Sequence, residues 1–202
     1  GKWQLGGDEN IIQSMGFDEH CLWNIRGATK ERYVSPTFLV NGISVDYKGQ
    51  YGPDIQQEFA EKFIRKNKNK PFFLYYPMTL PHYPFQPTPD SPDWDPNRDP
   101  YYNNTRYFAD MVEYLDKLVG DLISVVNKNG ISEETLIIFT SDNGTDHRII
   151  SYQNGQLFVP IIAASISGCS FGFLRFNFYP ARMLMGDSGS YFLGFVLAIT
   201  SV

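Results

Sequence analysis

Phe72-Phe73-Leu74-Tyr75-Tyr76 and Thr135-Leu136-Ile137-Ile138-Phe139-Thr140 are the two apolar runs that decide the fold. Each run is short and almost wholly apolar, which is typical of a strand that is buried on both faces of a sheet. The second run leads directly into Ser141-Asp142-Asn143-Gly144, and the first leads into a loop that begins at Pro77. Strands of this kind predict a parallel sheet.

Helical patterns lie on either side of the first run. Pro53 suits the first turn of a helix, and the apolar stripe that starts at Ile55 ends before Lys70-Pro71. A second stripe extends over residues 107–129 and stops at Gly130. The order helix, strand, loop, helix, strand predicts an α/β fold with right-handed crossovers, and Asn41-Gly42 upstream predicts a β-hairpin.

Polar residues follow both predicted strands, where functional groups of α/β folds gather. Asp142 and Asn143 offer a carboxylate and an amide oxygen, the donors that calcium prefers. His82 lies in a proline-stiffened loop and could donate a hydrogen bond to an anionic ester. Lys2 lies beside an aromatic residue and glycines, which could hold its ammonium group near an anion.

Composition excludes several classes of protein. The 202 residues include 17 Lys and Arg against 22 Asp and Glu, and 43% are hydrophobic. This apolar content excludes collagen, a coiled coil and a disordered chain, and the net charge of −5 argues against a nucleic-acid binder. Cys21 and Cys169 form no CxxC motif, so they leave the redox compartment open.

Charge is distributed unevenly along the chain. After Gln156 the charged residues are Arg175, Arg182 and Asp187, and residues 157–174 form an apolar run close to the length of a bilayer span, ~20 residues. We therefore expect two parts, an α/β piece over residues 1–156 and an apolar, membrane-like helical tail over residues 157–202.

Three motifs together resemble the type I sulfatases of the alkaline phosphatase superfamily. They are Gly1-Lys2-Trp3-Gln4-Leu5-Gly6, the run at 71–76 with Pro81-His82-Tyr83-Pro84, and the run at 137–144. The resemblance covers residues 1–156 and implies a partial alkaline phosphatase-like sandwich, with a mostly parallel central sheet flanked by helices. It also implies hydrolysis of an aryl sulfate or a sulfated carbohydrate, in the periplasm or outside the cell.

The resemblance also implies roles for single residues. Lys2 looks like the lysine that contacts the nucleophile and the sulfate, and His82 looks like the histidine that holds a sulfate oxygen. Asp142 and Asn143 look like two ligands of the active-site calcium. Gln4 stands where the commonest family pattern has a histidine, and its amide can bind a sulfate oxygen but cannot titrate near neutral pH.

The nucleophile of this family is a formylglycine, made by oxidising a Cys or Ser in the motif Cys/Ser-x-Pro-x-Arg. The sequence has no such motif, since Cys21 is followed by Leu22 and Trp23 without the Pro and Arg. We therefore expect the chain as given to be catalytically incomplete. A phosphatase or phosphodiesterase of the same superfamily is an alternative, against which the three His and the motif around Lys2 weigh.

The tail resembles a second family. Residues 172–182 and 185–190 look like membrane transferases that move N-acetylhexosamine-1-phosphate from a nucleotide sugar onto a polyprenyl phosphate. That resemblance implies a magnesium site at Asp187, with Asn177 nearby. Because the composition and the family change at one place, we expect a chimera whose junction lies near Gln156-Leu157.

Overall fold

The computed structural model describes residues 1–3, 9–23, 31–141, 146, 148 and 149. They belong to two compact units, Gly1–Thr140 and Ser141–Val202. In the second unit the backbone N–H of Ile149 donates to the carbonyl oxygen of Asp146 at 2.9 Å. The predicted boundary at 156–157 and the apolar tail lie outside the described residues. Among the described residues, no helix is long and apolar enough to cross a membrane.

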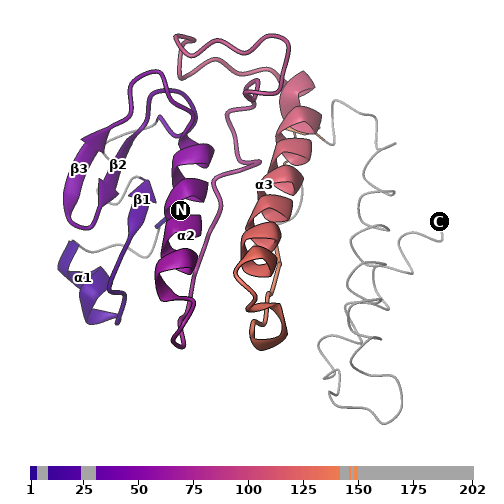
Figure 1. Ribbon diagram of the computed structural model, residues 1–202. Helices are drawn as coiled ribbons and strands as arrows, with labels where there is room; N and C mark the ends of the chain where they lie inside the picture. Colours follow the sequence, from indigo (N-terminus) through magenta and orange to yellow (C-terminus); the bar gives the residue numbers. More distant parts are fainter. Residues whose placement is uncertain (4–8, 24–30, 142–145, 147, 150–202) are drawn as a thin grey trace, which may run out of the picture. The chain divides into compact units, whose positions relative to one another are not determined.

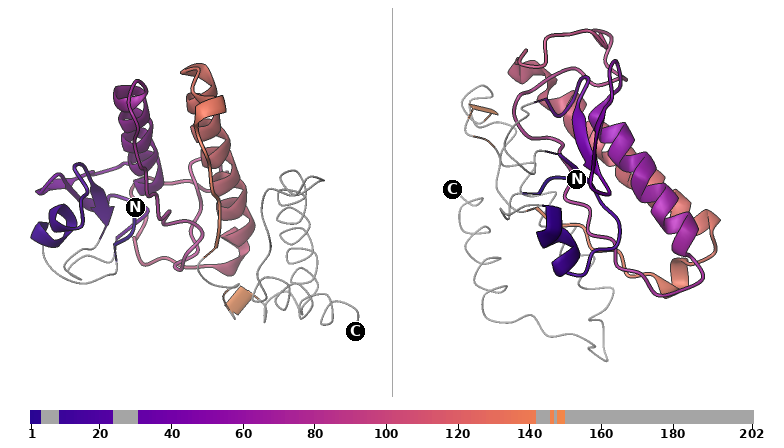
Figure 2. Two further views of the ribbon diagram at one scale, coloured as in Figure 1. Left: turned by 90° about the horizontal axis from the view of Figure 1, so that it is seen from below. Right: turned by 90° about the vertical axis from the view of Figure 1, so that its left-hand side faces the viewer.

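The first unit contains a small antiparallel sheet and two long helices (Figure 1). In chain order the elements are α1 (Glu9–Ser14), β1 (Cys21–Trp23), β2 (Thr37–Val40), β3 (Ile43–Asp46), α2 (Gly52–Asn67), the 3-10 helix η1 (Thr105–Tyr107), α3 (Phe108–Lys128) and the 3-10 helix η2 (Ser132–Glu134). The strand order is β1-β2-β3. Helix α2 contacts both β1 and α3 and so lies between the sheet and α3 (Figure 2).

Strands β2 and β3 form the hairpin that the sequence predicts. Asn41 and Gly42 connect them with φ angles of 49° and 86°, the positive values that a type I′ turn needs. The two helices predicted around residues 53–70 and 107–129 are α2 and α3. These predictions are confirmed.

Apolar side chains cover the sheet on both faces. One cluster joins the sheet to α2 and consists of Cys21, Trp23, Phe38 and Ile55. The other lies on the opposite face and consists of Trp3, Ile12, Leu22 and Leu39. Because successive side chains of a strand point to opposite faces, β1 contributes to both clusters and all three of its residues are buried. Strand β1 is therefore the central element of the core of this unit.

The run at 72–76, predicted to be a strand, forms no strand of the described sheet. Phe72 and Leu74 pack against Ile64 of α2 and neighbouring residues of α3, whereas Phe73 and Tyr75 are 74% and 56% exposed. The side chains thus alternate as in a strand, with one face packed and the other open. The prediction that this run is buried on both faces is wrong for the described structure.

The predicted strand at 135–140 is also corrected. Among the described residues no strand pairs with it, and Leu136, Ile138 and Phe139 are 78%, 76% and 66% exposed. A doubly buried strand needs partners at both edges and packing on both faces. Since the described residues supply these for β1 and not for this run, the mostly parallel sheet is not found among them.

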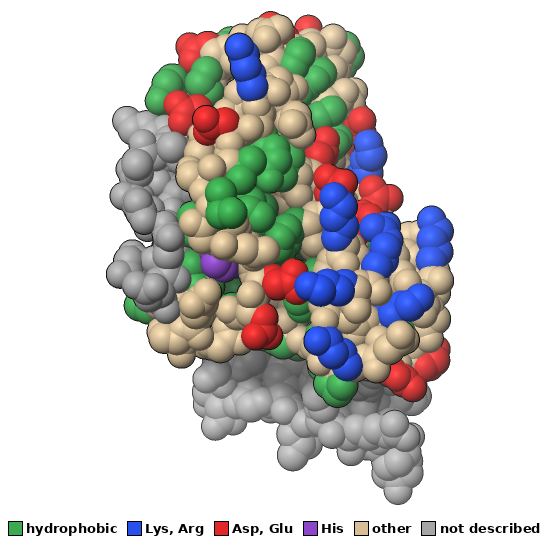
Figure 3. All heavy atoms as spheres, turned by 60° about the vertical axis from the view of Figure 1, so that its left-hand side comes forward, with side chains coloured by type: hydrophobic (Ala, Val, Ile, Leu, Met, Phe, Trp, Pro, Cys, Tyr) green, Lys and Arg blue, Asp and Glu red, His purple; other side chains and the backbone are tan. Residues whose placement is uncertain are grey.

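Lys and Arg side chains lie among Asp and Glu side chains on the face shown in Figure 3. Along α2, the acidic and basic groups form ion pairs one helical turn apart. These are Lys62–Glu58 at 2.7 Å and Arg65–Glu61 at 2.6 Å. Exposed ion pairs of this kind each contribute less than about 1 kcal/mol to stability. The position of α2 therefore depends mainly on its buried apolar residues, such as Ile55 and Ile64.

Gly52, the first residue of α2, gives a test of this packing. A Cβ at this position would lie 2.0 Å from the carbonyl oxygen of Arg32, whereas a Cβ at the exposed Gly120 of α3 would meet nothing within 4 Å. We expect Gly52→Ala to lower the free energy of unfolding by about 1–3 kcal/mol, because the backbone must shift. Gly120→Ala should raise it by about 0.5–1 kcal/mol through helix propensity.

Urea denaturation followed by circular dichroism measures both changes. Equal stability of the two variants would contradict the close approach of Gly52 to residue 32.

Candidate active site

Lys2 lies on a short extended segment, residues 1–3, that is held on both sides by backbone hydrogen bonds. On one side the N–H of Trp23 donates to the carbonyl oxygen of Gly1 at 2.9 Å, and Lys2 pairs with Trp23 in a parallel bridge. On the other side the N–H of Lys2 donates to the carbonyl oxygen of Pro77 at 2.8 Å. The segment therefore joins β1 to the end of the run at 72–76.

The side chain of Lys2 leaves this segment on the face of the sheet that carries Trp23. Residues paired directly in a parallel bridge point to the same face, and neighbours along the chain point to opposite faces. Trp3 confirms this direction, since it is buried in the cluster on the other face with Leu22. Lys2 is half-buried.

His82 lies in the long loop that follows Pro77, as the sequence predicts. Its backbone N–H donates to the carbonyl oxygen of Thr79 at 3.2 Å, and its side chain is exposed. The ring atom Nδ1 lies 2.7 Å from the carbonyl oxygen of Tyr83. Because a carbonyl can only accept, Nδ1 carries the proton of this bond. In the neutral ring Nε2 is then an acceptor, so a hydrogen bond from the ring to a sulfate oxygen requires the imidazolium form, in which Nε2 is protonated as well.

Tyr33 fixes the backbone of the turn that carries His82. The single proton of its hydroxyl is shared between the carbonyl oxygens of Thr79 at 2.9 Å and of His82 at 2.5 Å. The Tyr33 side chain is 1% exposed, and its burial raises the pKa of the phenol well above the ordinary value. A neutral phenol keeps its proton, so it remains a donor to this turn over the whole physiological range of pH.

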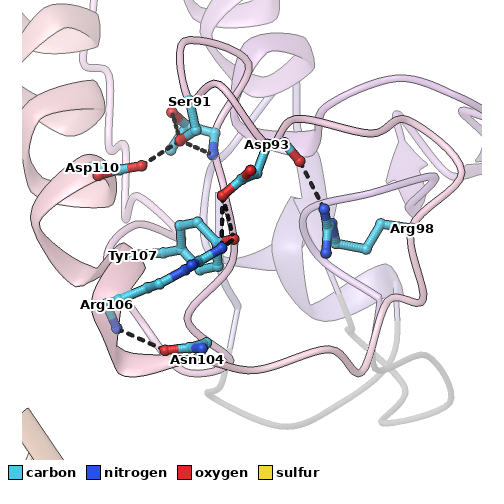
Figure 4. Close-up of polar contacts among 8 residues, drawn as sticks. Ser91, Asp93, Arg98, Asn104, Arg106, Tyr107 and Asp110 are labelled. Carbon is cyan, nitrogen blue, oxygen red and sulfur yellow. Dashed lines mark hydrogen bonds and ion pairs between the residues drawn. The ribbon is translucent and has the colours of Figure 1, made fainter.

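Farther along, the loop that carries His82 is tied to the start of α3 (Figure 4). Ser91 Oγ donates to Asp110 of α3 at 2.5 Å, and the hydroxyl of Tyr107 donates to Asp93 at 2.9 Å. Arg106 also forms an ion pair with Asp93 at 2.6 Å. Residues Pro77–Pro100 contain no helix or strand, as expected from their prolines.

The structure describes two of the residues predicted from the sequence to form sites. Lys2 and His82 are linked through Pro77, which accepts the backbone bond of Lys2 and begins the loop of His82. Gln4, Asp142, Asn143 and Asp187 lie outside the described residues. Within the described part of the chain, no group of three or more His, Cys, Asp or Glu side chains could hold a metal ion.

Two residues of this neighbourhood were missed by sequence reasoning. Tyr33 holds the turn of His82, and Arg32 stacks on Trp23, with its guanidinium carbon 4.0 Å from the ring centroid. Neither belongs to a motif with a known mechanism or to a periodic pattern. The dipeptide Arg32-Tyr33 thus carries no local signal that could have found it.

Comparison with known proteins identifies the class to which this fold and these residues belong. The chain belongs to the sulfatase family, whose family model matches residues 1–166. Membership implies the α/β fold of the alkaline phosphatase type, of which the described residues form a small antiparallel sheet and helices.

Individual relatives point in the same direction. The chain is 33% identical to human arylsulfatase A over 116 residues, which cover 55% of this chain and 21% of the relative. It is 29% identical to the N-acetylgalactosamine-6-O-sulfatase of Bacteroides thetaiotaomicron over 107 residues, which cover 53% of this chain and 19% of the relative.

A relative from another family also matches. The chain is 35% identical to the phospho-N-acetylmuramoyl-pentapeptide-transferase of Clostridium perfringens over 74 residues, which cover 37% of this chain and 22% of the relative. The chain thus spans about a fifth of the length of each of these curated relatives.

The hydroxyl of Tyr33 contacts the carbonyl oxygens of both Thr79 and His82, so its removal should loosen the turn that carries His82. Tyr33→Phe keeps the buried ring but takes a donor from the carbonyl groups of Thr79 and His82. We expect the free energy of unfolding to fall by about 1–3 kcal/mol, and amide hydrogen exchange to accelerate around His82. Tyr75→Phe, at a 56% exposed tyrosine, is the matched control. Unchanged exchange around His82 in Tyr33→Phe would contradict the positioning role of Tyr33.

Proposed function

We propose that this chain carries part of the active site of a sulfuric ester hydrolase. The observation that supports this most directly is the backbone bond between Lys2 and Pro77, since it brings the segments of Lys2 and His82 together within a sulfatase-family chain. Two potential donors to an oxyanion thus come from segments that are about 80 residues apart in sequence.

The chemistry of a sulfate ester explains why such donors are needed. When the S–O bond breaks, negative charge builds up on the leaving oxygen and on the sulfuryl oxygens, and groups that donate to these atoms lower the barrier. In our proposal, the Lys2 ammonium group and the Nε2–H of the imidazolium form of His82 bind sulfuryl oxygens. The amide of Gln4 adds a neutral hydrogen bond, which does not depend on pH.

A calcium ion is part of this proposal. Asp142 and Asn143 supply a carboxylate and an amide oxygen, and both are hard donors that suit calcium, which takes six to eight oxygens. Two residues cannot complete such a shell, so further ligands would come from elsewhere in the protein. A bound calcium would supply positive charge where the sulfate charge builds up.

The nucleophile proposed from the resemblance is a formylglycine. Its motif, Cys/Ser-x-Pro-x-Arg, does not occur in the 202 residues. Our proposal for this chain therefore concerns recognition of the sulfate group and binding of calcium. The substrate class is an aryl sulfate or a sulfated carbohydrate, and we propose a periplasmic or extracellular location. One relative is named as a sulfatase of N-acetylgalactosamine-6-O-sulfate groups.

The match to the Clostridium transferase supports a second candidate function. In this alternative, residues 157–202 are a piece of a polyprenyl-phosphate sugar-phosphate transferase that is joined to the sulfatase part. Asp187 would then contribute to a magnesium and nucleotide site, because carboxylate oxygens are ligands that magnesium accepts.

Sulfate recognition is tested with variants of the two described site residues. We expect Lys2→Ala and His82→Ala each to weaken binding of 4-nitrophenyl sulfate by at least about tenfold, the loss of one charge-assisted hydrogen bond. Isothermal titration calorimetry measures the affinity. Lys48→Ala removes the same charge from an exposed turn and should leave the affinity unchanged.

The same preparation tests for hydrolysis. We expect release of 4-nitrophenol to stay at the background rate, because the chain has no formylglycine motif. Turnover comparable to that of an intact sulfatase would contradict the incomplete site, and equal affinity in all three variants would contradict the roles of Lys2 and His82.

Calcium binding is tested at Asp142. Asp142→Asn keeps the shape of the side chain but removes its charge, so we expect the calcium dissociation constant to rise by about tenfold or more. Asp116→Asn, on the exposed face of α3, is the matched control. Luminescence of terbium displaced by calcium gives the affinities, and an unchanged affinity in Asp142→Asn would exclude this ligand.

A further inference from the structure

Arg32 carries a partly buried charge whose hydrogen-bond donors are incompletely paired among the described residues. Its guanidinium group is partly buried over the ring of Trp23, and this burial lowers the pKa of Arg32 below its ordinary value. Among the described residues, the buried atoms Nε and Nη1 of Arg32 have no hydrogen-bond partner. Buried donors are nearly always paired in native proteins, and a desolvated charge needs an opposite charge nearby.

Two other arginines of the described structure have their positive charge balanced by a carboxylate at ion-pair distance. Arg65 and Arg106 form ion pairs with Glu61 and Asp93, both at 2.6 Å. Within the described residues, Arg32 has no carboxylate partner at ion-pair distance. Stacking on an aromatic ring alone offsets only part of the desolvation of a cation.

The position of Arg32 connects it to both described site residues. Trp23, on which it stacks, is the direct bridge partner of Lys2, so the Trp23 ring and the Lys2 side chain leave the sheet on the same face. The next residue, Tyr33, donates to the carbonyl oxygen of His82. Arg32 thus stacks on the bridge partner of Lys2 and directly precedes the residue that holds the turn of His82.

The backbone around Arg32 is held in place. The N–H of Gly52 donates to the carbonyl oxygen of Tyr33 at 2.7 Å, and Val34 forms an antiparallel bridge with Tyr51. The carbonyl of Arg32 leaves no room for a Cβ at Gly52. Because the main chain is fixed, a guanidinium held here loses little conformational freedom when it binds an anion.

We propose that Arg32 is an additional anion-binding residue of the site formed by Lys2 and His82, and that it binds the sulfate group of the substrate. This inference rests on the proposed sulfatase function. A guanidinium presents several N–H donors in one plane and suits an oxyanion of this geometry better than an ammonium group does. The sulfate would supply both the negative charge and the acceptors that Arg32 lacks among the described residues.

The experiment uses the full chain and inorganic sulfate. Nitrogen-15 NMR of arginine side chains reports the Nε–H of Arg32 directly, and sodium chloride keeps the ionic strength constant during the titration. We expect the Nε–H resonance of Arg32 to shift with sulfate until it saturates. This readout needs no variant, so it holds even where a substitution at residue 32 disturbs folding.

Variants then measure the contribution of the guanidinium. We expect Arg32→Gln to raise the sulfate dissociation constant by at least about tenfold, and Arg32→Lys to give a smaller rise because it keeps the charge without the planar donors. The matched control is Arg98→Gln. Arg98 also stacks on an aromatic ring, at 4.6 Å from the centroid of Tyr102, and its buried Nε likewise has no partner among the described residues. It differs from Arg32 in that its Nη2 donates to the carbonyl oxygen of Asp93 at 2.7 Å.

The results distinguish the role of Arg32 from the proposed sulfatase function. Binding that is weakened by Lys2→Ala, His82→Ala and Arg32→Gln supports both the sulfatase site and Arg32 as a part of it. Binding that depends on Lys2 and His82, with no shift at Arg32 and no effect of Arg32→Gln, overturns the inference alone. Binding that depends on Arg32 but not on Lys2 or His82 places the anion there and counts against the proposed function. A chain that does not bind sulfate overturns the inference.

Discussion

The hydrogen bond from the N–H of Lys2 to the carbonyl oxygen of Pro77 is the contact on which the candidate site depends. The donor of this bond belongs to segment 1–3, which is paired with β1, the strand whose three residues are all buried. The acceptor, Pro77, is the first residue of the loop that carries His82. Any displacement of this short segment would therefore separate the two groups that we propose to bind sulfate, without any change in the groups themselves.

Packing supports this contact from both faces of the sheet. The cluster of Trp3, Ile12, Leu22 and Leu39 holds the segment from one face, and the side chains of Cys21, Trp23 and Phe38 hold β1 against α2 from the other. Polar donors at the rim thus rest on an apolar base that cannot rearrange without opening cavities, which is costly. Tyr33 adds a buried hydroxyl that ties the turn at Thr79 to the same base.

Sequence alone predicted the parts of this structure that depend on local patterns. The hairpin follows from Asn41-Gly42, and the helices α2 and α3 follow from apolar stripes with clear ends. Lys2 and His82 were selected as site candidates because each lies in a recognisable motif. Helix α1 and strand β1 were missed, since neither is long enough to show a period. The bond from Tyr33 to His82 spans 49 positions, and no local pattern encodes such a contact.

The apolar run at 135–140 has a consequence for the behaviour of the chain in solution. Six residues without a charge or a proline, rich in β-branched and aromatic side chains, are the type of segment from which stacked strands of many copies can grow. Here the backbone of the run is not paired with a described strand, and most of its side chains face solvent. Glu133 and Glu134 precede it directly, and their like charges would repel one another in such a stack.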